Sequence, residues 1–191
     1  MPTPASSRVT PAEYLALERQ AEHKSEYLDG EIFAMTGASR RHNLICLNIG
    51  AELRAQLKQR PCEVYTSDLR VKVNATGLYT YPDVVVVCGG PSFEDAEVDT
   101  LLNPTLLVDV LSKTTEDYDR AGKFEHYRAL ESLREYVLVA QQRYHVMHYV
   151  RRPDGAWLLT ETSDINSSLH LPSINCDLVL AEAYAKVRMD G

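Results

Sequence analysis

Two stretches of the chain are almost entirely apolar, which is the pattern of strands that are buried on both faces of a sheet. Residues 82–88 contain four consecutive valines, and residues 105–111 contain a single charged position. A strand with one solvated face alternates apolar and polar residues, whereas a continuous β-branched run indicates that both faces are covered. We therefore predict that these two segments are central strands of a sheet.

Capping residues and helical periodicity predict the helices that flank this sheet. Thr10 and Glu13 form a capping box around a proline at the first helical position, and Ser39 can cap a second helix. In that second helix, apolar residues recur every four positions and form one stripe. We expect helices over approximately 11–21, 39–59, 119–129 and 180–187.

Turn residues between short β-prone runs predict the remaining strands. Asp29-Gly30 separates two runs that contain Tyr, Leu, Ile and Phe, and Pro153-Asp154-Gly155 marks a second hairpin turn. We expect these additional strands over 25–28, 31–35, 62–66, 69–73, 135–140, 144–151 and 157–162.

The order of these elements predicts an α/β fold with a central mixed β-sheet, flanking helices and additional β-hairpins. No internal repeat and no Ser/Gly-rich linker divides the chain, and residues 89–103 are expected to form a loop. We therefore expect a single domain over 1–191, with a core of about 10–180 and a short flexible N-terminus at 1–9.

The composition is that of a globular protein. Hydrophobic residues make up 45% of the 191 positions and charged residues 25%, which excludes a disordered or low-complexity chain. The longest apolar runs are too short to cross a bilayer, and residues 1–8 lack the apolar segment of a signal peptide. We therefore expect a cytoplasmic protein that does not enter a membrane.

The formal net charge of −7 argues against a protein that coats nucleic acid without specificity. The charges are nevertheless uneven along the chain. Residues 40–72 carry seven basic and three acidic side chains, whereas residues 94–119 carry eight acidic and one basic. The basic segment is compatible both with a local DNA-facing surface and with an ordinary solvated face.

The chain has four cysteines and no CxxC pair. They are Cys46, Cys62, Cys88 and Cys176. Structural zinc sites use closely spaced ligand pairs, so this spacing argues against such a site. Three of the four lie in apolar stretches, which favours buried, reduced thiols. No local pattern marks any of them as a nucleophile.

A carboxylate inside a buried strand is the most informative feature for function. Asp109 interrupts the apolar run 105–111, and Asp83 begins the other apolar strand. An unpaired buried carboxylate costs several kcal/mol, so each needs a metal, a base or strong hydrogen bonds. Two such strands side by side would offer the hard oxygen ligands that Mg²⁺ requires. The structural alternatives are a turn or capping role for Asp83 and an ion pair with Arg or Lys for Asp109.

A lysine follows these strands at a position that can serve the same site. Asp119, Lys123 and Tyr127 are spaced by four residues, so on a helix they share one face. Lys123 could point toward the carboxylates and stabilise a phosphate or an attacking water. The structural alternative is an exposed Asp–Lys pair of little energetic value.

These landmarks, taken in order, resemble the restriction-endonuclease-like proteins of the PD-(D/E)XK nuclease superfamily over about Thr10 to Leu180. The motifs that carry the resemblance are Pro82-Asp83, Asp109-Val110-Leu111-Ser112, Tyr118-Asp119-Arg120 with Lys123, the hairpin Tyr27-Leu28-Asp29-Gly30-Glu31, His42, and Glu135-Tyr136-Val137. The resemblance implies a restriction-endonuclease-like fold with a central four-stranded mixed sheet. It also implies Mg²⁺-dependent hydrolysis of DNA phosphodiester bonds.

Carried over by position, the resemblance implies that Asp83 and Asp109 bind the metal. The superfamily motif has lysine two residues after the second acid, where this chain has Leu111. Lys123 is therefore the candidate catalytic lysine, and Lys113 is the alternative nearer in sequence. The resemblance also makes Glu31 and His42 candidate accessory residues, beside their alternatives as a solvated glutamate and a structural histidine.

The sequence thus predicts a DNA endonuclease that uses Mg²⁺, with Mn²⁺ as a substitute. No segment resembles a helix-turn-helix or zinc-finger module, so sequence-specific recognition is not supported. We expect weak, salt-sensitive DNA binding. The hairpin strands near 144–162 leave an edge to cover, so we expect a homodimer. The alternatives are a catalytically inactive protein of this fold that acts through oligomerisation or partner binding, and a different metal-dependent hydrolase.

Overall fold

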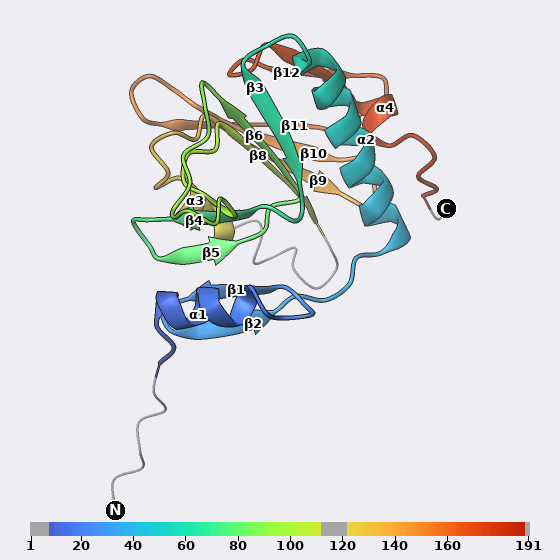
Figure 1. The fold of residues 1–191 in the computed structure, drawn as a ribbon. Coiled ribbons are helices and arrows are strands. Elements are labelled where there is room, and N and C mark those ends of the chain that lie inside the picture. The colour runs from blue at the N-terminus through green and yellow to red at the C-terminus, as the bar shows by residue number, and fades with distance from the viewer. Residues whose placement is uncertain (1–7, 112–121, 190–191) are drawn as a thin grey trace, which may run out of the picture.

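The computed structural model describes residues 8–111 and 122–189 (Figure 1). The predicted flexible N-terminus therefore lies largely outside the described residues. Within it, the backbone N–H of Val9 donates to the carbonyl of Gly30 at 3.1 Å, which fixes this residue against the first hairpin. No helix in the described ranges is both long and apolar enough to span a membrane.

The predicted central mixed sheet is present and has six strands in the order β11-β10-β9-β8-β6-β3. Strands β8 and β9 are parallel, and the other neighbours are antiparallel. A mixed group of four strands, β10-β9-β8-β6, thus lies between β11 and β3 at the two edges. The strands are β3 (Cys62–Thr66), β6 (Val84–Cys88), β8 (Leu106–Leu111), β9 (Glu135–Ala140), β10 (Val146–Arg151) and β11 (Trp157–Thr162).

A second sheet of five strands has the order β2-β1-β5-β4-β7. Its first hairpin was predicted from Asp29-Gly30, and both of these residues have positive φ as a tight turn requires. Strands β5 and β7 were not predicted, because each is too short for an alternation pattern. The strands are β1 (Ser25–Leu28), β2 (Glu31–Ala34), β4 (Arg70–Val73), β5 (Leu78–Thr80) and β7 (Thr100–Leu101).

The helices begin where their caps predict. Thr10 and Glu13 form the capping box, and Ser39 accepts from the N–H of His42 at 3.1 Å. The first and last helices are shorter than predicted. Of the predicted helix 119–129, residues 122–129 are described, and the α-helix there spans only Phe124–Tyr127. The helices are α1 (Pro11–Glu18), α2 (Arg40–Leu57), α3 (Phe124–Tyr127) and α4 (Leu180–Ala183). A further hairpin, β12 (Ser168–Leu171) and β13 (Cys176–Val179), was not predicted.

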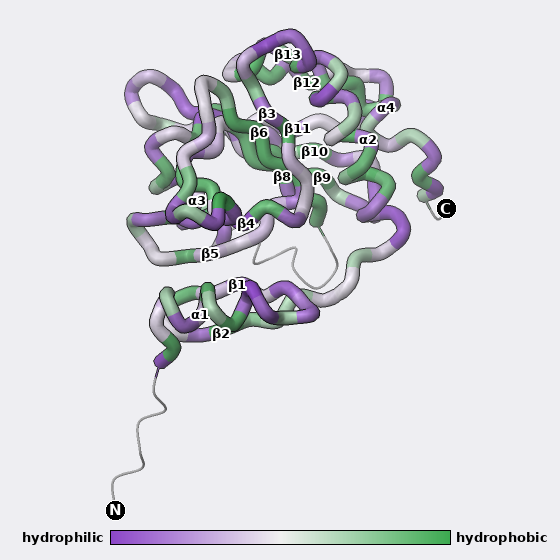
Figure 2. The backbone as a smooth tube through the Cα atoms, viewed as in Figure 1, coloured by the Kyte–Doolittle hydropathy of each residue, from purple (hydrophilic) through white to green (hydrophobic). Residues whose placement is uncertain are grey.

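Both faces of the six-stranded sheet are covered, which explains the unbroken apolar runs. The helix-side cluster packs α2 and α4 on one face, and the sheet-side cluster packs the second sheet on the other (Figure 1). Along β6, Val84 and Val86 belong to the helix-side cluster, whereas Val85 and Val87 belong to the sheet-side cluster. Figure 2 shows these central strands as the most hydrophobic part of the backbone. The prediction of two strands buried on both faces is confirmed.

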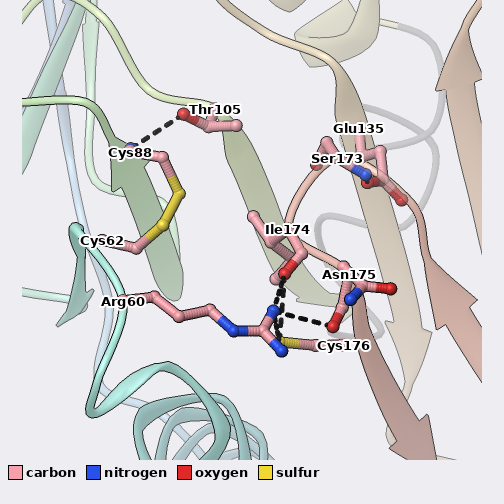
Figure 3. The surroundings of a disulfide bond; sticks show 9 residues. All are labelled: Arg60, Cys62, Cys88, Thr105, Glu135, Ser173, Ile174, Asn175 and Cys176. Atoms are coloured by element: carbon pink, nitrogen blue, oxygen red, sulfur yellow. Dashed lines mark hydrogen bonds between the residues drawn. A yellow bond between two sulfur atoms is a disulfide. The ribbon is translucent and has the colours of Figure 1, made fainter.

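The prediction of reduced thiols is wrong for two of the four cysteines. Cys62 on β3 and Cys88 on β6 are directly opposite each other in the strand register, and they form a disulfide (Figure 3). Their Cα atoms are 4.1 Å apart although 26 positions separate them in sequence. The pairing of the two strands creates this proximity, and no sequence spacing reveals it. Cys46 and Cys176 are free and buried, as predicted.

Candidate functional site

The ends of two central strands bring Asp83 next to the segment that carries Asp109. Val84 on β6 is paired with Val108 on β8, so the residue before Val84 lies beside the residues after Val108. The backbone N–H of Val110 donates to Oδ2 of Asp83 at 2.7 Å. The carboxylate of Asp83 is therefore held by the backbone of the residue that follows Asp109.

The first turns of α2 supply a further partner of Asp83. Nε2 of His42 lies 3.1 Å from Oδ2 of Asp83, and both side chains are largely shielded from solvent. Nδ1 of the same ring lies 3.4 Å from Sγ of Cys46. Burial, with a smaller contribution from the charge of Asp83, raises the pKa of the Cys46 thiol far above its usual value.

Asp109 is buried, with only 3% of its surface exposed. The hydroxyl of Tyr136 on β9 donates to Oδ2 of Asp109 at 2.7 Å. Tyr136 belongs to the sheet-side cluster, whereas the partners of Asp83 come from α2 on the helix side. The charge of Asp109 nevertheless contributes to the raised pKa of both Cys46 and Tyr127. Asp109 thus lies within electrostatic reach of the side chains around Asp83 and of those on the sheet side.

Lys123 directly precedes α3 and is buried rather than solvated. Its Nζ lies 3.1 Å from Oε1 of Glu26, and both side chains are about one-tenth exposed. The alternative of an exposed pair is therefore wrong for Lys123. Asp119, the proposed partner in that pair, lies outside the described residues, as does Lys113, the alternative catalytic lysine.

Glu26 on β1 is a site residue that the sequence reasoning missed. Besides Lys123, it accepts a hydrogen bond from the hydroxyl of Thr80 at 2.5 Å, and Thr80 lies 3.5 Å from the hydroxyl of Tyr127. Burial raises the pKa of Tyr127 well above its usual value, and the negative charges of Asp109 and Glu26 add to this effect. The available signal was a charged residue within a short hairpin strand, between Ser25 and Tyr27.

Glu31, the accessory carboxylate implied by the resemblance, is exposed at the beginning of β2. It is paired across the hairpin with Leu28, at the tip, whereas Glu26 is paired with Phe33. The acid that this hairpin buries is therefore Glu26, which lies five positions earlier than the acid that was expected.

Gln141, directly after β9, connects three elements at this end of the sheet. Its side chain is buried, its amide donates to the carbonyl of Leu111 at 2.9 Å, and its oxygen accepts from the hydroxyl of Ser39. Ser39 caps the helix that carries His42 and Cys46. Gln141 therefore fixes the start of α2 to the end of the strand that carries Asp109.

The basic segment 40–72 does not form one continuous surface. Arg70 is buried and pairs with Asp99, and Lys72 pairs with Glu94. Arg60 donates to the carbonyls of Ile174 and Asn175 (Figure 3). Part of the basic segment thus neutralises the acidic segment or stabilises a loop. The exposed basic side chains of α2 and its C-cap are those of Arg40, Arg54 and Lys58.

The donor types of this region include those of a hard divalent cation. Asp83, Asp109 and Glu26 carry carboxylate oxygens, which are the ligands that Mg²⁺ prefers, but in the described ranges these three do not all bring oxygens within 4.8 Å of one another. Lys123 and His42 supply positive or protonatable groups beside them. Acidic and basic side chains in one water-poor region are the groups that metal-assisted hydrolysis of a phosphate ester requires.

Residues 11–183 match the model of the Uma2 family, which is described as "Putative restriction endonuclease". This match covers most of the chain. The chain belongs to the Uma2 family.

Two proteins of Synechocystis sp. (strain ATCC 27184 / PCC 6803 / Kazusa) are similar to this chain. Uncharacterized protein sll1609 is 38% identical over 161 residues, covering 84% of this chain and 91% of that protein. Uncharacterized protein slr1290 is 34% identical over 183 residues, covering 96% of this chain and 95% of that protein.

A solved structure shows the same fold. It is a crystal structure of "a putative nuclease belonging to DUF820" from Anabaena variabilis ATCC 29413. The two structures have a TM-score of 0.77 at 18% sequence identity, over 94% of this chain and 99% of the other. The restriction-endonuclease-like fold and the family resemblance seen in the sequence are thus confirmed, and nuclease-like function is supported at the level of the family.

Proposed function

We propose that this Uma2 protein is a Mg²⁺-dependent DNA endonuclease that hydrolyses phosphodiester bonds, with Mn²⁺ as a substitute ion. The observation that carries the proposal is the hydrogen bond from Val110 to Asp83, because it brings one carboxylate next to the strand position that carries the other. The family description and the fold of a nuclease support the same chemistry.

In this proposal Asp83 and Asp109 hold the divalent ion. The ion would place positive charge on the scissile phosphate and lower the pKa of an attacking water. Tyr136 orients the carboxylate of Asp109 through its 2.7 Å hydrogen bond. The ammonium group of Lys123 stabilises the negative charge that develops on the phosphate oxygens, and Glu26 holds that ammonium group in place until DNA binds.

DNA binding is proposed to be weak and salt-sensitive. The net charge of −7 disfavours a polyanion, and part of the basic segment is engaged in ion pairs with acidic side chains. The exposed Arg40 begins α2, two residues before His42, so it can contact a phosphate near the carboxylates. Sequence specificity is not part of the proposal.

Cleavage of supercoiled plasmid tests the proposal. The wild-type chain should nick plasmid with Mg²⁺ or Mn²⁺ and lose activity with EDTA. Asp83→Asn, Asp109→Asn and Lys123→Met should each lower the rate by about a hundredfold or more. The two asparagine variants remove a carboxylate that holds the ion, and Lys123→Met removes the positive charge that stabilises the phosphate. Asp154→Asn is the matched control, because Asp154 lies in the exposed turn between β10 and β11.

Thermal melting of every variant separates a loss of chemistry from a loss of fold. Wild-type activity in folded Asp109→Asn would contradict the proposal. Metal binding without cleavage of DNA would instead indicate a different metal-dependent hydrolase.

A second candidate is a catalytically inactive protein of this fold that acts through oligomerisation. Leu111 favours it, because this residue occupies the position at which the superfamily motif places lysine. The strand β11 also favours it, since it is a sheet edge on which Leu158 and Leu159 are 42% and 41% exposed. Calorimetric titration with Mg²⁺ and Mn²⁺ distinguishes the two candidates, because only the endonuclease requires heat of binding that disappears in Asp83→Asn.

A homodimer is proposed for either candidate, with a second copy covering the β11 edge. Light scattering should then give twice the mass of 21.5 kDa. Leu159→Lys, which places a charge on that edge, should restore the single-chain mass. A single-chain mass for the wild type would exclude the dimer without affecting the proposed chemistry.

A further inference from the structure

The start of α2 presents an imidazole and a thiol on one face of the helix. His42 and Cys46 are four residues apart, so they lie one above the other, and Asp83 approaches from the beginning of β6. One candidate ligand atom from each of the three residues lies within 4.8 Å of the other two. In the described ranges this is the one group of three or more His, Cys, Asp or Glu side chains whose candidate ligand atoms all lie this close together.

The donor set of this group differs from the one that Mg²⁺ uses. Mg²⁺ takes oxygen ligands, whereas a site with one sulfur, one imidazole nitrogen and one carboxylate oxygen favours softer ions such as Zn²⁺ or Co²⁺. Three protein ligands also leave one tetrahedral position for water or a ligand, as in catalytic zinc sites. This candidate site uses one cysteine, whereas the structural zinc site that the sequence argues against would use closely spaced pairs of cysteines.

The three side chains are held in place by the surrounding structure. Cys46 is 9% exposed, and the side chains of His42 and Asp83 are 16% and 14% exposed. The N–H of Val110 holds Asp83 in place. Gln141 accepts a hydrogen bond from Ser39 and donates one to the carbonyl of Leu111, and these two bonds hold the start of α2 in place. An ion would therefore meet ligands that are already ordered, with part of the surface open for entry.

We propose that His42, Cys46 and Asp83 form a binding site for a thiophilic divalent transition-metal ion of the zinc class. The thiol of Cys46 releases its proton to solvent when the sulfur binds the ion. The site shares Asp83 with the proposed nuclease centre but does not require Asp109. The two proposals can therefore fail independently.

Absorption spectroscopy with Co²⁺ tests this site, because a thiolate bound to Co²⁺ gives a charge-transfer band that oxygen-only sites lack. The probe is CoCl₂ added to the full chain with its disulfide intact and no added thiol. We expect the band to saturate at one equivalent and to disappear when Zn²⁺ is added in equal amount. Cys46→Ser should abolish the band, and His42→Gln should weaken the affinity for Co²⁺ by more than about tenfold.

Two matched variants complete the experiment. Cys176→Ser removes the other free, buried thiol and should leave the band unchanged. Asp109→Asn should leave the band unchanged while it abolishes plasmid cleavage, which separates this site from the nuclease proposal. The absence of a thiolate band in the folded wild-type chain, or a band that survives in Cys46→Ser, would overturn the inference. Circular dichroism confirms that each variant is folded.

Discussion

A buried carboxylate must be compensated by its partners. Asp109 accepts a hydrogen bond from Tyr136, and Glu26 is paired with the ammonium group of Lys123 and accepts a hydrogen bond from Thr80. A buried ion pair contributes little net stability to a fold. Removing only one of its two members is strongly destabilising, because the other charge is then left buried without a partner. The pair therefore fixes where the charge of Lys123 lies, which the proposed action of Lys123 on a phosphate requires.

Glu26→Gln tests this function of the pair. The amide keeps the shape and a hydrogen bond to Thr80 but removes the negative charge that holds Lys123. We expect the rate of plasmid cleavage to fall by about ten- to a hundredfold. Glu31→Gln on the same hairpin changes an exposed glutamate and should leave the rate unchanged.

Thermal melting of both variants shows whether the effect is on chemistry or on folding. A folded Glu26→Gln protein with the wild-type rate would mean that the pair only fills space. A loss of rate in Glu31→Gln would mean that the hairpin tip contacts the DNA.

At the scale of elements, the site is assembled from the ends of strands and the start of a helix. Gln141 holds α2 to the end of β8, and the disulfide holds the edge strand β3 to β6 (Figure 3). Val84, one residue after Asp83, is paired with Thr66 on β3. The disulfide is at the other end of that pairing, so it restrains the strand that directly follows Asp83 without touching the site.

Reduction of the disulfide should destabilise the protein. Closing a loop of 26 positions restricts the unfolded chain, so we expect the free energy of unfolding to fall by about 2–4 kcal/mol when the bond is removed. Urea denaturation with and without dithiothreitol measures this. The double variant Cys62→Ser/Cys88→Ser should match the reduced wild type and should not respond to dithiothreitol.

An unchanged urea midpoint for the reduced wild type would contradict this expectation. Because disulfides are rare in reducing compartments, the result also shows how far the stability of this fold depends on the redox state of its surroundings.

At the scale of the whole molecule, we expect the distribution of charge rather than its sum to govern the proposed binding of DNA. The net charge is −7, yet the pairs of Arg70 with Asp99 and Lys72 with Glu94 cancel charges within the second sheet and its loop. The exposed basic side chains of α2 and its C-cap then lie along one helix. Only the start of that helix is next to the carboxylates, so position along α2 should decide which of these charges contact DNA.

Arg40→Gln and Lys58→Gln test this, because each removes one exposed positive charge. The 18 residues of α2 span about 27 Å, so the two positions lie at opposite ends of the helix. Arg40→Gln should make the slope of log affinity against log salt concentration shallower by about one, as expected for one lost phosphate contact. Lys58→Gln should leave the slope unchanged.

Fluorescence anisotropy with labelled duplex DNA over a series of salt concentrations measures both slopes. Equal effects of the two variants would show that only net charge matters, and a larger effect of Lys58→Gln would place the DNA at the far end of the helix.

The sequence by itself determined the features that depend on neighbouring residues. The capping box at Thr10, the cap at Ser39, the turn at Asp29-Gly30 and the doubly buried strand β6 all follow from local chemistry, and all are present. Asp109 was recognisable as a site candidate for the same reason, since a charge inside an apolar run is visible without any knowledge of the fold.

Only the tertiary structure decided which distant segments meet. The strands β5 and β7 are too short to have a pattern of their own, and they exist because the five-stranded sheet supplies their hydrogen-bonding partners. The pairing of β3 with β6 made a disulfide of Cys62 and Cys88, and the packing of β1 near the start of α3 brought Glu26 to Lys123. Strand register and packing are set by the whole chain, so the residues next to a position in the sequence do not determine its partners in space.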